Sequence, residues 1–290
     1  MSAPPFLGRA PGKLILFGEH AVVYGHPALA MAVDRGTTVR LTPGEGPRRV
    51  RAAAMEDPRL PVALDALLPA QGLDVQIDTE LPVGRGMGSS GSLAVALVRA
   101  WAAWQGRTAS LQECIERGFR LERLFHGNPS GLDHTVSARG CALRYRRGSA
   151  GLQLEEIRLG PLPLVVLDTG KAGDTAELVA GVAARRPQVD PLLERIGALV
   201  LEVGPALEAG DLPVLGEAMR ENQRLLAEIG VSSPEIESLV AFARTHGALG
   251  AKLAGAGGGG VVIALHPRPD ELVAAAAEAG IEAFAVGPAR

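Results

Sequence analysis

A glycine-rich loop between a predicted strand and a predicted helix constrains the fold of this chain more than any other feature. The loop, residues 82–91, contains four glycines and two serines. It follows an alternating apolar pattern over 73–79 and precedes an Ala-, Leu- and Val-rich stretch over 92–104. Glycines let backbone N–H groups approach an anion, and the start of the following helix adds a favourable dipole. The sequence therefore predicts a phosphate-binding strand–loop–helix unit.

We expect this loop to bind the phosphates of ATP. One of the hydroxyls of Ser89 and Ser90 is a candidate ligand for Mg²⁺, as in other nucleotide-binding loops. The Gly-Lys-Ser/Thr ending of a Walker loop is absent, which excludes an ordinary P-loop. The residues predicted to contact ATP are Pro82, Gly84, Gly86, Met87, Gly88, Ser89, Ser90, Gly91 and Ser92.

Two alternatives for the loop stay open. Gly86, Gly88 and Gly91 match the three-glycine pattern of dinucleotide-binding proteins, and Glu113 lies at the distance of their ribose-binding acid. Glu113 falls inside a helical pattern, however, whereas that acid normally ends a parallel strand. We therefore rank dinucleotide binding behind ATP binding. The other alternative is a turn that only connects two elements.

Two carboxylates and a lysine form a second candidate group. Asp133 follows a turn-rich stretch at an expected helix start, and Glu122 lies on a helix predicted over 111–125. Lys13 is one of only three lysines, although the chain has 29 basic residues, and it sits in a Pro-Gly-Lys turn. A kinase acting on an alcohol needs one acid on the metal, one acid near the hydroxyl proton and a fixed cation. A helix cap for Asp133 and a solvated helix face for Glu122 are the alternatives.

Composition narrows the class of protein. With 290 residues, 47% of them hydrophobic, and a net charge of −3, the chain is expected to be globular and not to bind nucleic acid. The arginines within 144–147 are interpreted as a solvated strand end. Apolar runs fall far short of the roughly 20 residues of a membrane span, and no export signal is found, so we expect a cytoplasmic protein without a membrane partner. Cys114 and Cys141 lack metal-ligand spacing, and reduced thiols are expected.

The periodicity of apolar residues predicts an α+β protein in two parts. Strands are expected at 14–17, 37–41, 73–79, 164–167 and 261–265. Helices are expected at 92–104, 111–125, 176–184, 192–206, 215–229 and 236–245. We place the domain junction within 146–163, which divides the chain into an N-terminal domain, 1–160, and a C-terminal domain, 161–290.

Three segments, in matching order and spacing, resemble the GHMP kinase superfamily: Pro11–His20, the loop 82–91 and Lys252–Gly260. Within it, four further stretches look like the mevalonate kinases, namely Gly18–Gly25, His126–Asp133, Asp168–Gly170 with Thr175, and Glu221–Gln223. The likeness spans nearly the whole chain. It implies the two-domain GHMP fold, with an S5-like N-terminal domain and a ferredoxin-like C-terminal domain.

The resemblance also implies an activity and the residues that carry it. The expected reaction is phosphorylation of the 5-hydroxyl of mevalonate, with ATP and Mg²⁺ as cofactors; a homodimer is an expectation from the family alone. Asp133 would be the catalytic base beside Lys13, and Ser90 and Glu122 would hold Mg²⁺. The implied substrate-binding residues are Lys13, Glu19, His20, Asp133, Thr175 and Gly257.

Three positions depart from the family pattern. His134 stands where asparagine is common, Gly91 where alanine is usual and Met87 where leucine is usual. We expect His134 to tune substrate contacts and the other two to leave phosphate binding intact. The alternatives are a GHMP kinase for phosphomevalonate, homoserine or a sugar, a decarboxylase of mevalonate diphosphate, and a regulator that binds ligand without transfer. The retained Lys13 and Asp133 count against the regulator.

Overall fold

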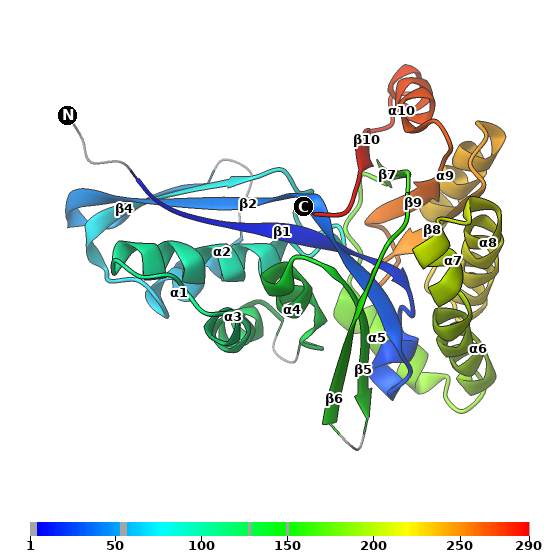
Figure 1. Ribbon diagram of the computed structural model, residues 1–290, viewed down its shortest axis with the longest axis horizontal. Coiled ribbons are helices and arrows are strands. Elements are labelled where there is room, and N and C mark those ends of the chain that lie inside the picture. The colour runs from blue at the N-terminus through cyan, green and yellow to red at the C-terminus, as the bar shows by residue number, and fades with distance from the viewer. Residues whose placement is uncertain (1–4, 53–56, 127–128, 149–150, 290) are drawn as a thin grey trace.

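Two β-sheets with flanking helices make up the computed structural model, which describes residues 5–52, 57–126, 129–148 and 151–289 (Figure 1). The first half contains β1 Phe6–Phe17, a 3₁₀ turn η1 Ala21–Tyr24, β2 Ala28–Pro47, β3 Arg49–Ala52, α1 Leu60–Asp65, β4 Gln71–Thr79, α2 Ser89–Trp104, α3 Leu111–His126, α4 Leu132–Arg139, β5 Ala142–Gly148 and β6 Gly151–Ile157. The second half contains β7 Leu164–Asp168, α5 Thr175–Ala184, α6 Asp190–Glu202, α7 Gly204–Ala209, α8 Leu212–Glu228, α9 Pro234–Thr245, β8 Gly250–Ala254, β9 Val261–Leu265, α10 Pro269–Glu278 and β10 Ala283–Val286. The predicted α+β class is confirmed.

The long strand β2 organises the first sheet, whose strand order is β3-β4-β2-β5-β6 with β1 paired to β2. Antiparallel partners β4 and β5 occupy different stretches of β2. In β4 the alternating residues Leu73, Val75 and Ile77 are buried. They pack in one core with the apolar side chains of α2. Helices α1 to α4 lie on one side of the sheet, so α2 and α4 begin close to β1 (Figure 1).

The second sheet is antiparallel throughout, in the order β10-β7-β9-β8. Its chain order, strand, helices, two strands, helix and strand, is the ferredoxin-like arrangement that the resemblance implies. All five residues of β9 are buried. Alternate residues of β9 belong to two different core clusters, so both faces of the strand are covered, which explains its continuous apolar sequence.

One hydrophobic core crosses from the first half to the second. Leu14 and Leu16 of β1 share a buried cluster with Val166 of β7 and Ile263 of β9. The C-terminal segment also returns to the first sheet, where Pro288 forms a bridge with Val33. The halves therefore bury apolar surface against each other. We propose residue 160 as the domain boundary, because β6 ends and β7 begins on either side of it.

Several element predictions need correction. The region 146–163 stays our predicted domain junction, but it is not free of secondary structure: it contains the end of β5 and all of β6, and β6 is the polar edge strand of the first sheet. The helix predicted over 192–206 is divided into α6 and α7, because Gly204 and Pro205 interrupt it. Strand β1 is longer than predicted and is irregular in register between Pro11 and Lys13.

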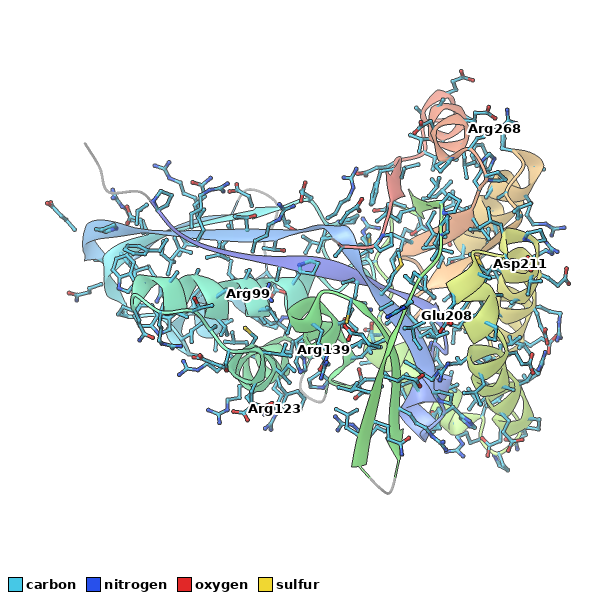
Figure 2. All side chains as sticks on the ribbon, in the orientation of Figure 1. Arg99, Arg123, Arg139, Glu208, Asp211 and Arg268 are labelled. Carbon is cyan, nitrogen blue, oxygen red and sulfur yellow. The ribbon has the colours of Figure 1, made fainter. Side chains whose placement is uncertain are left out.

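Charged side chains project from the outer surfaces of both halves, as Arg123 of α3 and Arg268 beside α10 illustrate (Figure 2). Among the residues that the structure describes, no helix is long and apolar enough to cross a membrane. Cys114 and Cys141 are both free thiols.

Candidate active site

The glycine-rich loop joins β4 to α2 as predicted and leaves the start of the helix open. Gly84, Gly86 and Gly88 have φ angles of 72°, 88° and 68°, a region that glycine adopts without strain. Gly88 is the N-cap of α2, and no side chain of the described residues caps the first N–H groups of this 16-residue helix. Backbone donors and the positive end of the helix dipole therefore face the same place, which suits a phosphate group.

A second glycine-rich loop, 255–260, packs directly on the first. A Cβ on Gly86 would lie 2.8 Å from the carbonyl oxygen of Ala254, and one on Gly260 would lie 2.8 Å from that of Arg85. Only glycine permits such close backbone contact. The two halves of the molecule thus meet at the loop.

Lys13 and Asp133 are adjacent, although 120 positions separate them. The Nζ atom of Lys13 lies 3.3 Å from Asp133 Oδ1 and donates to the carbonyl oxygen of Gly86 at 3.2 Å. The lysine side chain is 4% exposed and the aspartate side chain 29% exposed. The N-cap of α4 is Gly131, so Asp133 lies in the first turn of the helix and does not cap it. A buried cation therefore touches a partly accessible carboxylate beside the loop.

Glu122 and Ser90 form the next part of the site. The Ser90 hydroxyl donates to Glu122 Oε1 at 3.3 Å and lies 2.9 Å from His126 Nε2. Glu122 is 1% exposed, so the alternative of a solvated helix face is wrong. Carboxylate and hydroxyl oxygens are ligands that suit Mg²⁺. Within the described parts of the chain, no three His, Cys, Asp or Glu side chains gather into a metal site. A Mg²⁺ ion here would take its remaining ligands from phosphates and water.

Two residues of the predicted ATP set have side chains that serve the core. Ser92 is fully buried; its hydroxyl donates to the carbonyl oxygen of Ala10 at 2.7 Å and accepts from the N–H of Thr37 at 3.1 Å. Met87 is also fully buried, in the core shared by both halves. The prediction that Ser92 contacts ATP is therefore corrected, since its hydroxyl ties α2 to the sheet. Met87 fills an apolar space, as a leucine would.

Glu19 needs a similar correction. Its carboxylate is fully buried, with Lys252 of β8 bound to Oε1 and Asn222 of α8 donating to Oε2 at 3.1 Å. Each oxygen has a partner within the protein and the side chain is fully buried, so in this structure Glu19 is not exposed to a substrate. Burial lowers the pKa of Lys252, and the charge of Glu19 acts in the opposite direction. This pair joins the end of β1 to the second half.

The other implied substrate residues lie at different places along this interface. His20 has a φ of 59°, uncommon outside glycine, and its Nε2 donates to the carbonyl oxygen of Ala256 at 2.8 Å. Thr175 is exposed at the start of α5. Gly257 is buried, and a Cβ there would lie 2.0 Å from the carbonyl oxygen of Val231, so this glycine allows close backbone packing.

The dinucleotide alternative is wrong for this fold. The acid expected to bind a ribose, Glu113, lies on α3, where it pairs with Arg107 and Arg117. The first sheet is largely antiparallel, whereas a dinucleotide-binding unit needs parallel strands joined by crossover helices.

Arg147 is exposed near the end of β5, as the interpretation of a solvated strand end expects. Its Nη2 also lies 3.1 Å from the position of a Cβ on Gly131, two residues before Asp133, a proximity that sequence reasoning did not anticipate. Arg144 pairs with Glu155 instead. The arginine run itself was the available signal, but only the pairing of β5 in the sheet separates the roles of its members.

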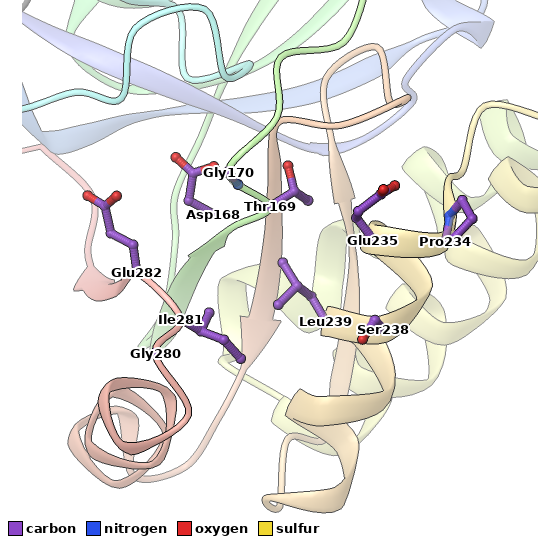
Figure 3. Close-up of a pocket in the computed structure, with 10 residues that line it drawn as sticks. All are labelled: Asp168, Thr169, Gly170, Pro234, Glu235, Ser238, Leu239, Gly280, Ile281 and Glu282. Atoms are coloured by element: carbon purple, nitrogen blue, oxygen red, sulfur yellow. Dashed lines mark hydrogen bonds between the residues drawn. The ribbon is translucent and has the colours of Figure 1, made fainter.

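Two hollows border these elements. One, of about 80 Å³, lies beside the loop and is lined by Asp57, Arg59, Val83, Gly84, Ser89, Ser90, Leu93, Phe125 and His126. The other, of about 630 Å³, is lined by Asp168, Thr169, Gly170, Pro234, Glu235, Ser238, Leu239, Gly280, Ile281 and Glu282 (Figure 3). Neither Lys13 nor Asp133 lines the larger hollow, and its Asp168 and Glu235 are paired with Arg85 and Lys171. We therefore centre the candidate site on the loop.

Comparison with known proteins identifies the class. Residues 52–141 match the model of the GHMP kinases N terminal domain, and residues 205–285 match that of the GHMP kinases C terminal domain. Residues 1–43 match a galactokinase galactose-binding signature. The chain belongs to the GHMP kinase family, and the predicted superfamily and fold are confirmed.

Within the GHMP kinase family, the chain is similar to mevalonate kinases. The chain is 38% identical to the mevalonate kinase of Pyrococcus horikoshii, with 93% of this chain and 91% of the relative covered. It is 37% identical to that of Methanothermobacter thermautotrophicus, with 89% of each covered. The crystal structure of L. major mevalonate kinase in complex with R-mevalonate superposes with a TM-score of 0.85 at 31% identity, over 99% of each chain.

Proposed function

We propose that this chain is a mevalonate kinase, which transfers the terminal phosphate of ATP to the 5-hydroxyl of mevalonate. The observation that carries the proposal is the ion pair of Lys13 and Asp133 beside the glycine-rich loop. The two relatives described above, at 37–38% identity, are mevalonate kinases, and a similar solved structure holds R-mevalonate. These likenesses select mevalonate among small alcohols.

In the proposed reaction, Asp133 accepts the proton of the substrate hydroxyl as the hydroxyl oxygen attacks the terminal phosphorus atom of ATP, and ADP leaves as the bond between that phosphorus and the bridging oxygen breaks. Lys13 offsets the negative charge that develops on the transferring phosphate, and it is already held in place by its bond to Gly86. The backbone N–H groups of 84–91 bind the phosphates. The smaller hollow, which is lined by Arg59 and Phe125, lies beside the loop and is the proposed contact point for part of the nucleoside.

Ser90 and Glu122 would hold Mg²⁺. The ion neutralises charge on the phosphates when it is bound. Both side chains lie within hydrogen-bond distance of each other at the N-terminus of α2, where the phosphates are expected. The residues of this chain therefore supply two oxygen ligands of different charge.

We place the substrate between His20, Thr175 and Arg147. Mevalonate carries a carboxylate, and Arg147 is an exposed cation near the Asp133 turn. His20 offers an imidazole at the interface of the halves. We also propose a cytoplasmic homodimer, which light scattering would report as twice the 30.0 kDa mass of one chain.

A coupled assay of ADP release tests the function. Purified protein is supplied with ATP, Mg²⁺ and, separately, mevalonate, phosphomevalonate, homoserine and galactose. Galactose is included because residues 1–43 match a galactose-binding signature. We expect the highest kcat/KM with mevalonate; a higher value with any other alcohol contradicts the proposal. Carbon dioxide release from mevalonate diphosphate would reveal a decarboxylase instead.

The variant Asp133→Asn tests the role of the base. It keeps the size of the side chain and removes the proton acceptor, so turnover should fall by about 10²- to 10⁴-fold. Binding of a non-hydrolysable ATP analogue, measured by calorimetry, should persist because the loop is unchanged. Equal loss of binding and turnover would show that Asp133 maintains the loop instead.

A further inference from the structure

His134 was expected to tune substrate contacts, but its side chain is buried against α3. Its side chain is 2% exposed, and its Nδ1 lies 2.5 Å from Glu122 Oε2. The carboxylate can only accept, so the imidazole donates. The ring also packs at 5.4 Å, centroid to centroid, from Phe119. Gly118 leaves room for it, since a Cβ there would lie 3.3 Å from His134 Cβ.

The hydrogen bond from His134 gives the two carboxylate oxygens of Glu122 different partners. Oε2 is held by His134, while Oε1 faces the Ser90 hydroxyl at the start of α2. Glu122 is 1% exposed, so water does little to orient its carboxylate. A buried carboxylate with one oxygen fixed has one direction left in which to bind a ligand.

The same helical turn carries both parts of the site. Asp133 and His134 are consecutive in the first turn of α4, yet Asp133 meets Lys13 and His134 meets Glu122. Any shift of this turn would therefore move both the Asp133 carboxylate and the imidazole of His134 that bonds Glu122.

We infer that His134 is a positioning residue, which fixes the Glu122 carboxylate so that Oε1 is presented for Mg²⁺ beside Ser90. This inference rests on the proposed function, because it assumes that Glu122 ligates the metal. Residues that orient a metal ligand in this way typically change metal affinity by about 10- to 100-fold when they are replaced.

The test is binding of Mn²⁺ in place of Mg²⁺, followed by electron paramagnetic resonance in the presence of a non-hydrolysable ATP analogue. His134→Phe keeps a ring of similar size but cannot donate, and we expect Mn²⁺ affinity to fall by about 10-fold or more. His134→Asn should restore most of the affinity, because its Nδ2 lies as many bonds from the backbone as the imidazole Nδ1. If His134 only filled space, the presence of an N–H donor in His134→Asn would not give it a higher Mn²⁺ affinity than His134→Phe.

The matched control is His266→Phe, the same replacement at a buried histidine of the second half. His266 bonds the carbonyl oxygen of His246 and the N–H of Arg268, so its loss affects stability without reaching the metal ligands. Its Mn²⁺ affinity should equal that of the wild type. Equal affinity in His134→Phe and the wild type would overturn the inference.

Glu122→Gln separates the inference from the function on which it rests. If this variant binds Mn²⁺ as tightly as the wild type does, Glu122 is not a ligand, and both the proposed metal site and the role of His134 fall. If Glu122→Gln loses Mn²⁺ while His134→Phe retains it, the site stands and only the inference is wrong.

Discussion

At the scale of single residues, the candidate site depends on polar groups held in buried places. His20 combines a positive φ angle, a buried imidazole and a hydrogen bond to Ala256 in the other half. Burial lowers the pKa of His20 because a charged imidazole is poorly solvated there. The neutral ring is therefore part of the folded state at the interface.

This lowered pKa predicts a pH dependence of stability. The unfolded chain protonates His20 near pH 6.5, whereas the folded protein resists protonation, so the free energy of unfolding should decrease as the pH falls below about 6.5. His20→Gln keeps an N–H at the same distance from the backbone and cannot titrate. Urea unfolding at pH 7.5 and pH 5.5 should show a smaller decrease for the variant. Parallel decreases in both proteins would contradict this assignment.

At the scale of elements, the site depends on how closely α2 approaches α4. A Cβ on Gly91 of α2 would lie 2.8 Å from the backbone nitrogen of His134 and 2.9 Å from the carbonyl carbon of Asp133. We expected only that Gly91, where the family usually has alanine, would leave phosphate binding intact. In this chain, however, the close approach of the two helices requires a residue without a Cβ. It lets the phosphate-binding helix touch the turn that carries Asp133.

Gly91→Ala should push the two helices apart. We expect a loss of about 1–3 kcal/mol in the free energy of unfolding, typical of overpacking, and a lower kcat because Asp133 moves from Lys13. Gly181→Ala is the control, since that glycine lies on helix α5 with nothing within 4 Å of an added Cβ. It should be neutral or slightly stabilising. Unchanged kcat in Gly91→Ala would show that the helices have room to adjust.

At the scale of the whole molecule, the two halves are joined by a shared core and by buried charges. The pair of Glu19 and Lys252 is fully buried and connects residues 233 positions apart. Leu14 and Ile263 belong to the same hydrophobic cluster. The loop that we propose to bind ATP contributes Met87 to this cluster and packs on Ala254 of the second half, so its shape depends on contact between the two halves.

Lys252→Met should therefore destabilise both halves together. Removing one partner leaves Glu19 buried without its cation, which typically costs about 3–5 kcal/mol. Trp101 and Trp104, the two tryptophans of the chain, lie on α2, so fluorescence reports on the first half and circular dichroism on both. The two urea transitions should coincide and shift equally. Adding Glu19→Gln should recover much of the loss; separate transitions would show that the halves unfold independently.

Much of the fold and part of the site follow from the sequence. The alternating pattern of 73–79, the glycines after it and the Ala-rich stretch beyond predict β4, the loop and α2, because these features act over a few residues. The chemistry of Lys13 and Asp133 could likewise be expected from their residue types and local turns. Periodicity did not find the hairpin of β5 and β6, because β6 is an edge strand with mostly exposed side chains and the buried stretch of β5, 142–145, is short.

The amino-acid sequence by itself determined which local structures form and which chemical groups are present. Only the tertiary structure decided where those groups point. The Ser92 side chain faces the core, Glu19 forms a buried ion pair with Lys252, and His134 bonds Glu122. Each of these residues lies in or beside a predicted motif, yet none of these partners was predicted. The physical reason is that burial and hydrogen-bond partners come from residues far apart in the chain, which no local pattern contains.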